Sequence, residues 1–302
     1  MQPILARLRA APAVDYRTMP MEAARKLFEE TSRPWNQGGP IVPSRELRIP
    51  SSGYAMRARL YRPRESERLP LTVFVHGGGW VFGSIDTHDG NMRRLASASS
   101  GAVLGIDYRL APEHPFPTPL EDVLAALAYA ESGALGQEVD AARLALAGDS
   151  AGANLLLAAL LRRRDEGKAP LRGAALFYGC YLPLFTTPSH ASLGNGDYLL
   201  TTEMMRWYWR QFLGAEGFDT KSLAAPYRAD LAGLPPLYLL AAGLDPLLDD
   251  TVMLAEKLAR AGIDFRFDHV PGVVHGYLRM AGELSAARRS IEAAGRFLAE
   301  HF

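Results

Sequence analysis

Short apolar runs alternate with longer helical patterns along most of the sequence, and this alternation limits the possible folds more than any other feature. Strand, helix and strand in succession form the unit from which parallel sheets with helices on both faces are built. Residues 71–75 and 237–240 are nearly continuous in apolar character, as central strands covered on both faces should be. The sequence therefore predicts an α/β fold with an eight-stranded, mostly parallel sheet. The expected strands are 45–49, 55–61, 71–75, 102–107, 143–147, 173–178, 237–242 and 265–270.

The first two expected strands are separated only by residues 50–53, a Pro-Ser-Ser-Gly turn. This spacing is too short for a crossover connection, so we expect an antiparallel hairpin at one edge of the sheet. Helices of the core are expected at 89–100, 120–131, 151–165, 248–261 and 285–301. Several are followed by a glycine, which indicates a left-handed residue at the helix end. These glycines are Gly101, Gly133, Gly167 and Gly262.

Two segments fall outside the alternation. Residues 1–44 contain two short helical patterns and then a linker rich in proline and glycine, which indicates a helical arm. Residues 180–225 carry dense aromatic side chains around a helical pattern at 201–213. We expect both segments to form a cap over an α/β core made of residues 45–179 and 226–302. The aromatic side chains either pack the cap onto the core or line a pocket, and the pocket candidates are Trp80, Tyr181, Phe185 and Trp207.

Composition excludes several classes of protein. Lys and Arg total 33, as do Asp and Glu, so the zero net charge gives no basic surface for nucleic acid or anionic membranes. The longest apolar run, residues 123–130, is far short of the roughly 20 residues that span a bilayer. Cys180 is the sole cysteine, which excludes an intrachain disulfide and a Cys-rich zinc site. Arg7 and Arg9 are not followed by the apolar stretch of a secretory signal, so we expect a soluble, cytoplasmic chain.

The pentapeptide Gly148-Asp149-Ser150-Ala151-Gly152 follows an expected strand and opens an expected helix. In that context the G-x-S-x-G pattern is typical of a nucleophilic serine on a sharp turn. Only small neighbours fit there, because a side chain at either glycine would clash with the strand or the helix. The amide of Ala151 lies at the helix N-terminus, where developing negative charge is favoured. The alternative interpretation is an ordinary strand-to-helix turn.

The sequence His76-Gly77-Gly78-Gly79-Trp80 directly follows another expected strand. Three consecutive glycines leave backbone N–H groups unobstructed, so these groups can converge on one anionic oxygen. A phosphate-binding loop would require a following Lys-Ser or Lys-Thr, or G-x-G-x-x-G spacing, and neither is present. We expect His76 to fix the turn rather than to transfer protons.

A serine nucleophile needs a base, and chain order selects it. In hydrolases of this strand-turn-helix type the order is nucleophile, acid, histidine. His275 lies between the last expected strand and the last expected helix. Asp245 is the carboxylate nearest the end of the preceding strand, and Pro246 keeps it out of helical conformation. Asp249 and Asp250 fall in a first helical turn, where carboxylates complement the dipole, so we assign Asp245 as the partner of His275.

These motifs in this order resemble the hormone-sensitive-lipase-like family of α/β-hydrolase esterases. The similarity covers nearly the whole chain from about residue 45, and its motifs are His76 to Trp80, Asp107 to Pro117, Gly148 to Gly152, Asp245 to Leu247, and His275-Gly276. The resemblance implies the α/β-hydrolase fold and an oxyanion hole made by the amides of Gly77, Gly78 and Ala151. It implies no metal and no cofactor. For residues 107–117 we expect a structural role, because their charged members can pair locally.

The resemblance implies a serine carboxylesterase in which Ser150 attacks an ester, His275 takes its proton and Asp245 orients the imidazole. The expected partner is a small ester with a short acyl chain or an aryl group. Hydrolysis of an arylformamide, amide or carbamate by the same residues is the catalytic alternative. A non-catalytic small-molecule receptor is another, although the related plant gibberellin receptors lack the catalytic histidine that is present here. An exposed edge at the last strand can pair two copies into a homodimer.

Overall fold

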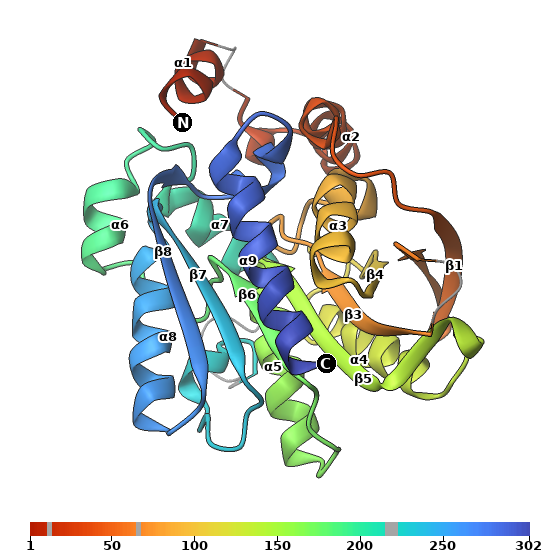
Figure 1. Cartoon of the computed structure of the whole chain (residues 1–302). Helices are drawn as coiled ribbons and strands as arrows, with labels where there is room; N and C mark the ends of the chain where they lie inside the picture. Colours follow the sequence, from red (N-terminus) through yellow and green to blue (C-terminus); the bar gives the residue numbers. More distant parts are fainter. Residues whose placement is uncertain (11–13, 65–67, 215–222) are drawn as a thin grey trace.

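The computed structural model describes residues 1–10, 14–64, 68–214 and 223–302, and within them one sheet of eight strands runs through the molecule (Figure 1). The strand order is β1-β2-β4-β3-β5-β6-β7-β8. Strands β3 to β8 pair in parallel, whereas β2 is antiparallel to both β1 and β4. The expected α/β fold is therefore confirmed. The strands are β1 (Ser44–Ser51), β2 (Tyr54–Tyr61), β3 (Leu69–Val75), β4 (Ala102–Ile106), β5 (Val139–Asp149), β6 (Ala174–Phe177), β7 (Leu237–Leu244) and β8 (Phe265–Val274).

The hairpin at the first edge has the geometry that its sequence predicts. Ser51 pairs with Tyr54, so the loop consists of Ser52 and Gly53 alone. Both loop residues have positive φ, 44° and 78°, which is typical of a two-residue turn that matches the twist of its strands.

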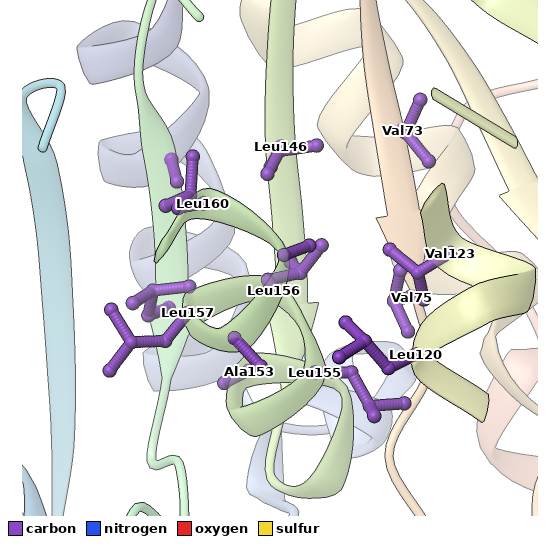
Figure 2. Packing of buried hydrophobic residues seen from close by; sticks show 14 of the residues in the cluster. Val73, Val75, Leu120, Val123, Leu146, Ala153, Leu155, Leu156, Leu157 and Leu160 are labelled. Atoms are coloured by element: carbon purple, nitrogen blue, oxygen red, sulfur yellow. The ribbon is translucent and has the colours of Figure 1, made fainter. Parts of the chain in front are cut away.

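The helices cover both faces of the sheet because successive side chains of a strand point to opposite faces. Leu71 and Val73 of β3 pack in one apolar cluster with residues of α4 (Thr118–Glu131), α5 (Ala151–Asp165) and α8 (Leu248–Arg260). Phe74 packs in a second cluster with residues of α3 (Ile85–Ser99) and α9 (Ser285–His301). Figure 2 shows the first of these clusters, where leucines of α5 meet side chains of β3, β5 and α4. The buried helix α5 begins directly after Ser150, which itself follows the last residue of β5.

The helix bounds agree with the expected ones except at a few ends. Helix α3 begins at Ile85 rather than residue 89, because Ser84 and Thr87 form a capping box there. The left-handed residue after α3 is Ser100 and not Gly101. The helices are α1 (Gln2–Ala10), α2 (Met21–Ser32), α3 (Ile85–Ser99), α4 (Thr118–Glu131), α5 (Ala151–Asp165), α6 (Pro188–Leu193), α7 (Thr202–Leu213), α8 (Leu248–Arg260) and α9 (Ser285–His301).

Helices α2 and α7 belong to the two segments outside the alternation, and they meet beyond the end of β3. Phe28 of α2 and Trp207 of α7 pack against one small apolar cluster that contains Phe82. The division into core and cap stays a prediction, and residues 11–13 and 215–222 of the expected cap lie outside the described residues. Within the described part of the chain, no helix is long and apolar enough to cross a membrane.

Candidate active site

Three side chains form a hydrogen-bonded line at the carboxyl ends of parallel strands. Ser150 directly follows β5, Asp245 follows β7, and His275 follows β8. The Nε2 atom of His275 lies 2.9 Å from Ser150 Oγ, and its Nδ1 lies 2.7 Å from Asp245 Oδ2. The other oxygen of Asp245 accepts the backbone N–H of Leu247 at 2.9 Å, which fixes the fully buried carboxylate. Because carboxyl ends of parallel strands meet at one edge, residues 125 and 30 positions apart come together.

The backbone at Ser150 has the strained shape expected of a nucleophile turn. Its φ is 54° and its ψ is −118°, a combination that residues with a side chain rarely adopt. A Cβ on Gly148 would lie 2.6 Å from the carbonyl oxygen of Val75, and one on Gly152 would overlap the same oxygen. The two glycines are therefore required by the close approach of β3, and the turn aims the serine hydroxyl out of the sheet.

Tyr178 is a site residue that the sequence analysis missed. It lies just beyond β6, is fully buried, and its ring meets the His275 imidazole edge-on with centroids 5.0 Å apart. Its φ of 36° is unusual for a residue with a side chain. A tyrosine at the end of a strand carries no local signal for this contact. Its packing restricts the rotation of the imidazole.

The two rejected carboxylates, Asp249 and Asp250, anchor the segment after β6. Asp249 accepts the backbone N–H of Ser189 at 2.8 Å, and Asp250 accepts that of Tyr181 at 3.0 Å. Burial raises the pKa of Asp250 to about 8. Both side chains therefore do more than complement the helix dipole, and the carboxylate that contacts His275 is Asp245.

The amide of Gly77, one of the three oxyanion donors expected from the sequence, already donates a hydrogen bond. It donates to Oδ1 of Asp149 at 2.9 Å. The amides of Gly78, Gly79 and Ala151 have no hydrogen-bond acceptor among the described residues. The positive φ values of Gly78 and Gly79, 125° and 61°, explain why glycine occupies both positions. The free donors of the turn are thus one residue further along than expected.

Asp149 is buried directly beneath this turn. His88 Nε2 lies 3.3 Å from its Oδ1. Burial alone would raise the pKa of the Asp149 carboxyl, but the facing His88 and the Gly77 N–H together hold it below its ordinary value. The carboxylate is therefore ionised and pins the first glycine of the turn. No spacing in the sequence connects positions 88 and 149, so this pair was not foreseen.

His76 holds the other side of the turn. Its ring stacks on Tyr108 with centroids 4.5 Å apart, and its Nδ1 donates to the carbonyl oxygen of Gly77 at 2.8 Å. Burial lowers the pKa of His76 to about 3, so the ring is uncharged near neutral pH. This geometry fits the structural role expected from the sequence.

The four aromatic pocket candidates are not brought together around Ser150. Trp80 is fully buried against Trp209 and Phe212 of α7. Tyr181 is also fully buried and lines a narrow cavity with Asp250 and other residues. Phe185 is half-buried beneath the guanidinium of Arg206, 4.5 Å from the ring centroid. Trp207 is half-buried and stacks on Phe82 at 6.1 Å, which places it nearest to the glycine turn among those not enclosed.

Sequence comparison finds relatives with a known activity. The chain is 38% identical over 242 residues to the carboxylesterase NlhH of Mycobacterium tuberculosis, covering 78% of this chain and 74% of the relative. It is 35% identical over 249 residues to the esterase LipI of the same organism, covering 80% and 77%. Residues 72–279 match the model of the alpha/beta hydrolase fold family.

Solved structures agree with the sequence relatives. A hyperthermophilic esterase from the archaeon Pyrobaculum calidifontis superposes with a TM-score of 0.91 at 33% identity, covering 99% of this chain and 96% of the other. The ester hydrolase EH1AB1 from the Lake Arreo metagenome, complexed with a bipyridine phosphonate derivative, gives 0.94 at 33% identity, covering 100% and 98%. The chain belongs to the alpha/beta hydrolase fold family. The resemblance to hormone-sensitive-lipase-like esterases within that fold is confirmed.

Proposed function

We propose that this carboxylic ester hydrolase cleaves short-chain acyl and aryl esters through Ser150, His275 and Asp245. The observation that carries the proposal is the 2.9 Å contact between the serine hydroxyl and an imidazole held by a buried carboxylate at 2.7 Å. A hydroxyl becomes an effective nucleophile only when such a base is within hydrogen-bond reach. The esterase relatives supply the substrate class, because both sequence relatives and both solved structures are described as acting on esters.

The reaction runs as two acyl transfers. Ser150 Oγ bonds to the ester carbonyl carbon while His275 Nε2 takes the hydroxyl proton. The tetrahedral intermediate collapses, His275 returns the proton to the leaving alcohol, and an acyl-enzyme remains. Water then attacks this acyl-enzyme with the same proton transfers, which releases the carboxylic acid and restores the serine. Asp245 keeps the imidazole in the tautomer that presents Nε2 to the serine and stabilises the imidazolium.

The negative charge on the carbonyl oxygen is stabilised by backbone donors. In our proposal these are the amides of Gly78, Gly79 and Ala151, since the Gly77 amide already donates to Asp149. The Ala151 amide adds the N-terminal end of α5. Loss of one such donor typically costs about 3–4 kcal/mol of transition-state stabilisation.

Enclosure of the site supports small substrates. Ser150 exposes 6% of its surface, and aromatic side chains of α2 and α7 gather beside the glycine turn. In our proposal residues 1–44 and 180–225 act as the cap that limits the length of the acyl chain.

The test is a panel of p-nitrophenyl esters of graded acyl length, assayed beside matched aryl amides and an arylformamide. We expect kcat/KM to be highest for acetate and butyrate esters and to fall for long chains. Ser150→Ala should lower kcat by at least about 10⁴-fold without unfolding the protein. Near-normal turnover by that variant would remove Ser150 as the nucleophile. Faster turnover of the amide or formamide than of the ester would replace the substrate class, and ligand binding without turnover by the parent protein would indicate a receptor.

A further inference from the structure

Helix α7 packs against the segment that follows the glycines of the proposed oxyanion hole. Trp80 has a φ of 61°, a left-handed conformation that a residue with a side chain keeps only when its surroundings hold it. Its indole stacks on the ring of Phe212, with centroids 4.1 Å apart and planes 6° from parallel. Trp209 packs against the same indole at 4.7 Å. Two side chains of one helix thus fix the residue next to the proposed donor Gly79.

A third residue of α7 contacts the turn itself. A Cβ built on Gly79 would overlap the ring of Tyr208, so that ring rests directly on the Gly79 backbone. Tyr208 also meets Phe82 edge-on at 6.1 Å. The contacts of α7 therefore reach Gly79, Trp80 and Phe82.

Helix α2 holds the same segment through Arg25. Its Nε donates to the carbonyl oxygen of Val81 at 2.9 Å, and its Nη2 donates to that of Ala111 at 2.9 Å. The N–H of Ala111 in turn donates to the carbonyl oxygen of Trp80 at 2.9 Å. The carboxylate of Glu113 pairs with the same guanidinium at 2.6 Å and fixes its orientation. Arg25 thus joins the helical arm to two loop segments beside the glycine turn.

We propose that α2 and α7 hold the oxyanion turn in its working shape, with Phe212, Trp209 and Arg25 as positioning residues. The inference rests on the proposed function, because it assigns the donors to the amides of Gly78 and Gly79. Backbone donors point where their φ and ψ angles direct them, and small misplacements of such groups reduce catalysis strongly. The packing of the two helices therefore affects the rate of the chemical step, and not only the binding of the substrate.

The experiment compares conservative variants on one short-chain ester and one alkyl boronic acid. A boronic acid bonds to the serine and forms a tetrahedral adduct, so its affinity depends on the oxyanion donors. For Phe212→Leu and Trp209→Leu we expect kcat to fall about 10- to 100-fold. KM should change less than about threefold, and the boronate Ki should rise by about the factor by which kcat/KM falls.

The arm is tested in the same way. Arg25→Met removes the donors to both carbonyl groups and should lower kcat and weaken boronate binding together. Arg25→Lys keeps the charge but not the forked geometry, so it should recover only part of the loss. Arg45→Met is the matched control, because Arg45 also pairs with a carboxylate, Glu138, but on the hairpin edge of the sheet.

Stability is separated from positioning by a core control. Phe297→Leu removes a similarly buried ring from α9, and all variants are compared by thermal unfolding and near-ultraviolet circular dichroism. It should lower the melting temperature and leave kcat and the boronate Ki of the folded protein unchanged. The proposal is wrong if Phe212→Leu and Arg25→Met keep both values within twofold of the parent while Ser150→Ala is inactive. A rise in KM at constant kcat would also overturn it, because the rings would then bind substrate. An active Ser150→Ala variant would instead refute the proposed function.

Discussion

Among the described residues, six residues other than glycine have positive φ, and three of them lie at or beside the candidate site. Ser150, Trp80 and Tyr178 all have positive φ although each carries a side chain. Such conformations cost about 1–3 kcal/mol each and persist only where the surroundings enforce them. Ser150 is the proposed nucleophile, Trp80 follows the glycine turn, and Tyr178 packs on the His275 ring. The packing around these residues therefore stabilises backbone conformations that are unfavourable in an isolated peptide.

Asp250 gives a prediction at this scale. Its pKa of about 8 in the folded state exceeds the value near 4 of an unfolded carboxyl group. A raised pKa means that its stabilising contribution is complete below about pH 4 and is lost as the pH rises through about 8. Asp250→Asn keeps an acceptor for the Tyr181 N–H without the charge. The parent should therefore lose free energy of unfolding as the pH rises from about 4 to about 8, whereas the variant should not. The difference between the two proteins should grow over this range.

The measurement is urea unfolding of both proteins at a series of pH values. The difference should reach a few kcal/mol, since each pKa unit corresponds to about 1.4 kcal/mol. A difference between parent and variant that does not change with pH would contradict the raised pKa.

At the scale of elements, a second arginine attaches helix α2 to the core, and it lies close in sequence to His275. Arg279 lies in the short 3-10 helix Tyr277–Gly282 that follows His275. Its Nη1 donates to Ser32 Oγ at 3.0 Å, and its guanidinium lies 5.1 Å from the Phe28 ring centroid. Arg279→Met should cost about 1–2 kcal/mol of unfolding free energy, because a hydrogen bond and a cation–π contact are lost.

Chemical denaturation checks this value, and limited proteolysis shows whether residues 1–44 are released first. Arg289→Met serves as the control, since Arg289 donates only to Ser285 within its own helix among the described residues. Equal stability of the Arg279 variant and the parent would show that α2 is held by other contacts alone.

The ends of helices with a regular apolar pattern were predicted well. The ends of elements that depend on a side-chain cap or on strand pairing were not. Helices α5 and α9 begin and end at the expected residues, because apolar periodicity and flanking turns coincide there. Strand β8 extends to Val274, four residues beyond expectation, since pairing with β7 resumes after an irregularity in the register. The start of α3 depends on one capping box that the apolar pattern does not show.

For the whole molecule, chain order was sufficient to bring Ser150, Asp245 and His275 together, but it did not indicate the long-range contacts of the glycine turn. Ser150, Asp245 and His275 each follow a strand, so topology alone brings them to one edge. The hydrogen bond from Gly77 to Asp149 and the stacking of Trp80 on Phe212 join residues 72 and 132 positions apart with no local signal. The contacts that occupy the Gly77 amide and enclose Trp80 come from distant parts of the chain, so no motif in the sequence could indicate them.

The outer edge of the sheet leads to a prediction about assembly. Strand β8 is the last in the strand order, so its outer backbone groups have no partner strand in the described chain (Figure 1). Phe267 on this strand is 36% exposed, and Pro271 fits an edge strand because it lacks an N–H. A long edge with an exposed aromatic side chain favours pairing with a second copy. We expect a homodimer that joins two β8 strands.

Sedimentation equilibrium over a range of protein concentrations measures the assembly state. Phe267→Glu places two like charges at a symmetric interface and should shift the measured mass to that of one chain. The variant should keep its activity on short esters, because Ser150 follows a different strand, β5. A parent protein that sediments as one chain at micromolar concentration would refute the dimer. That result would mean that the twist and the charges of the β8 edge prevent strand pairing between copies.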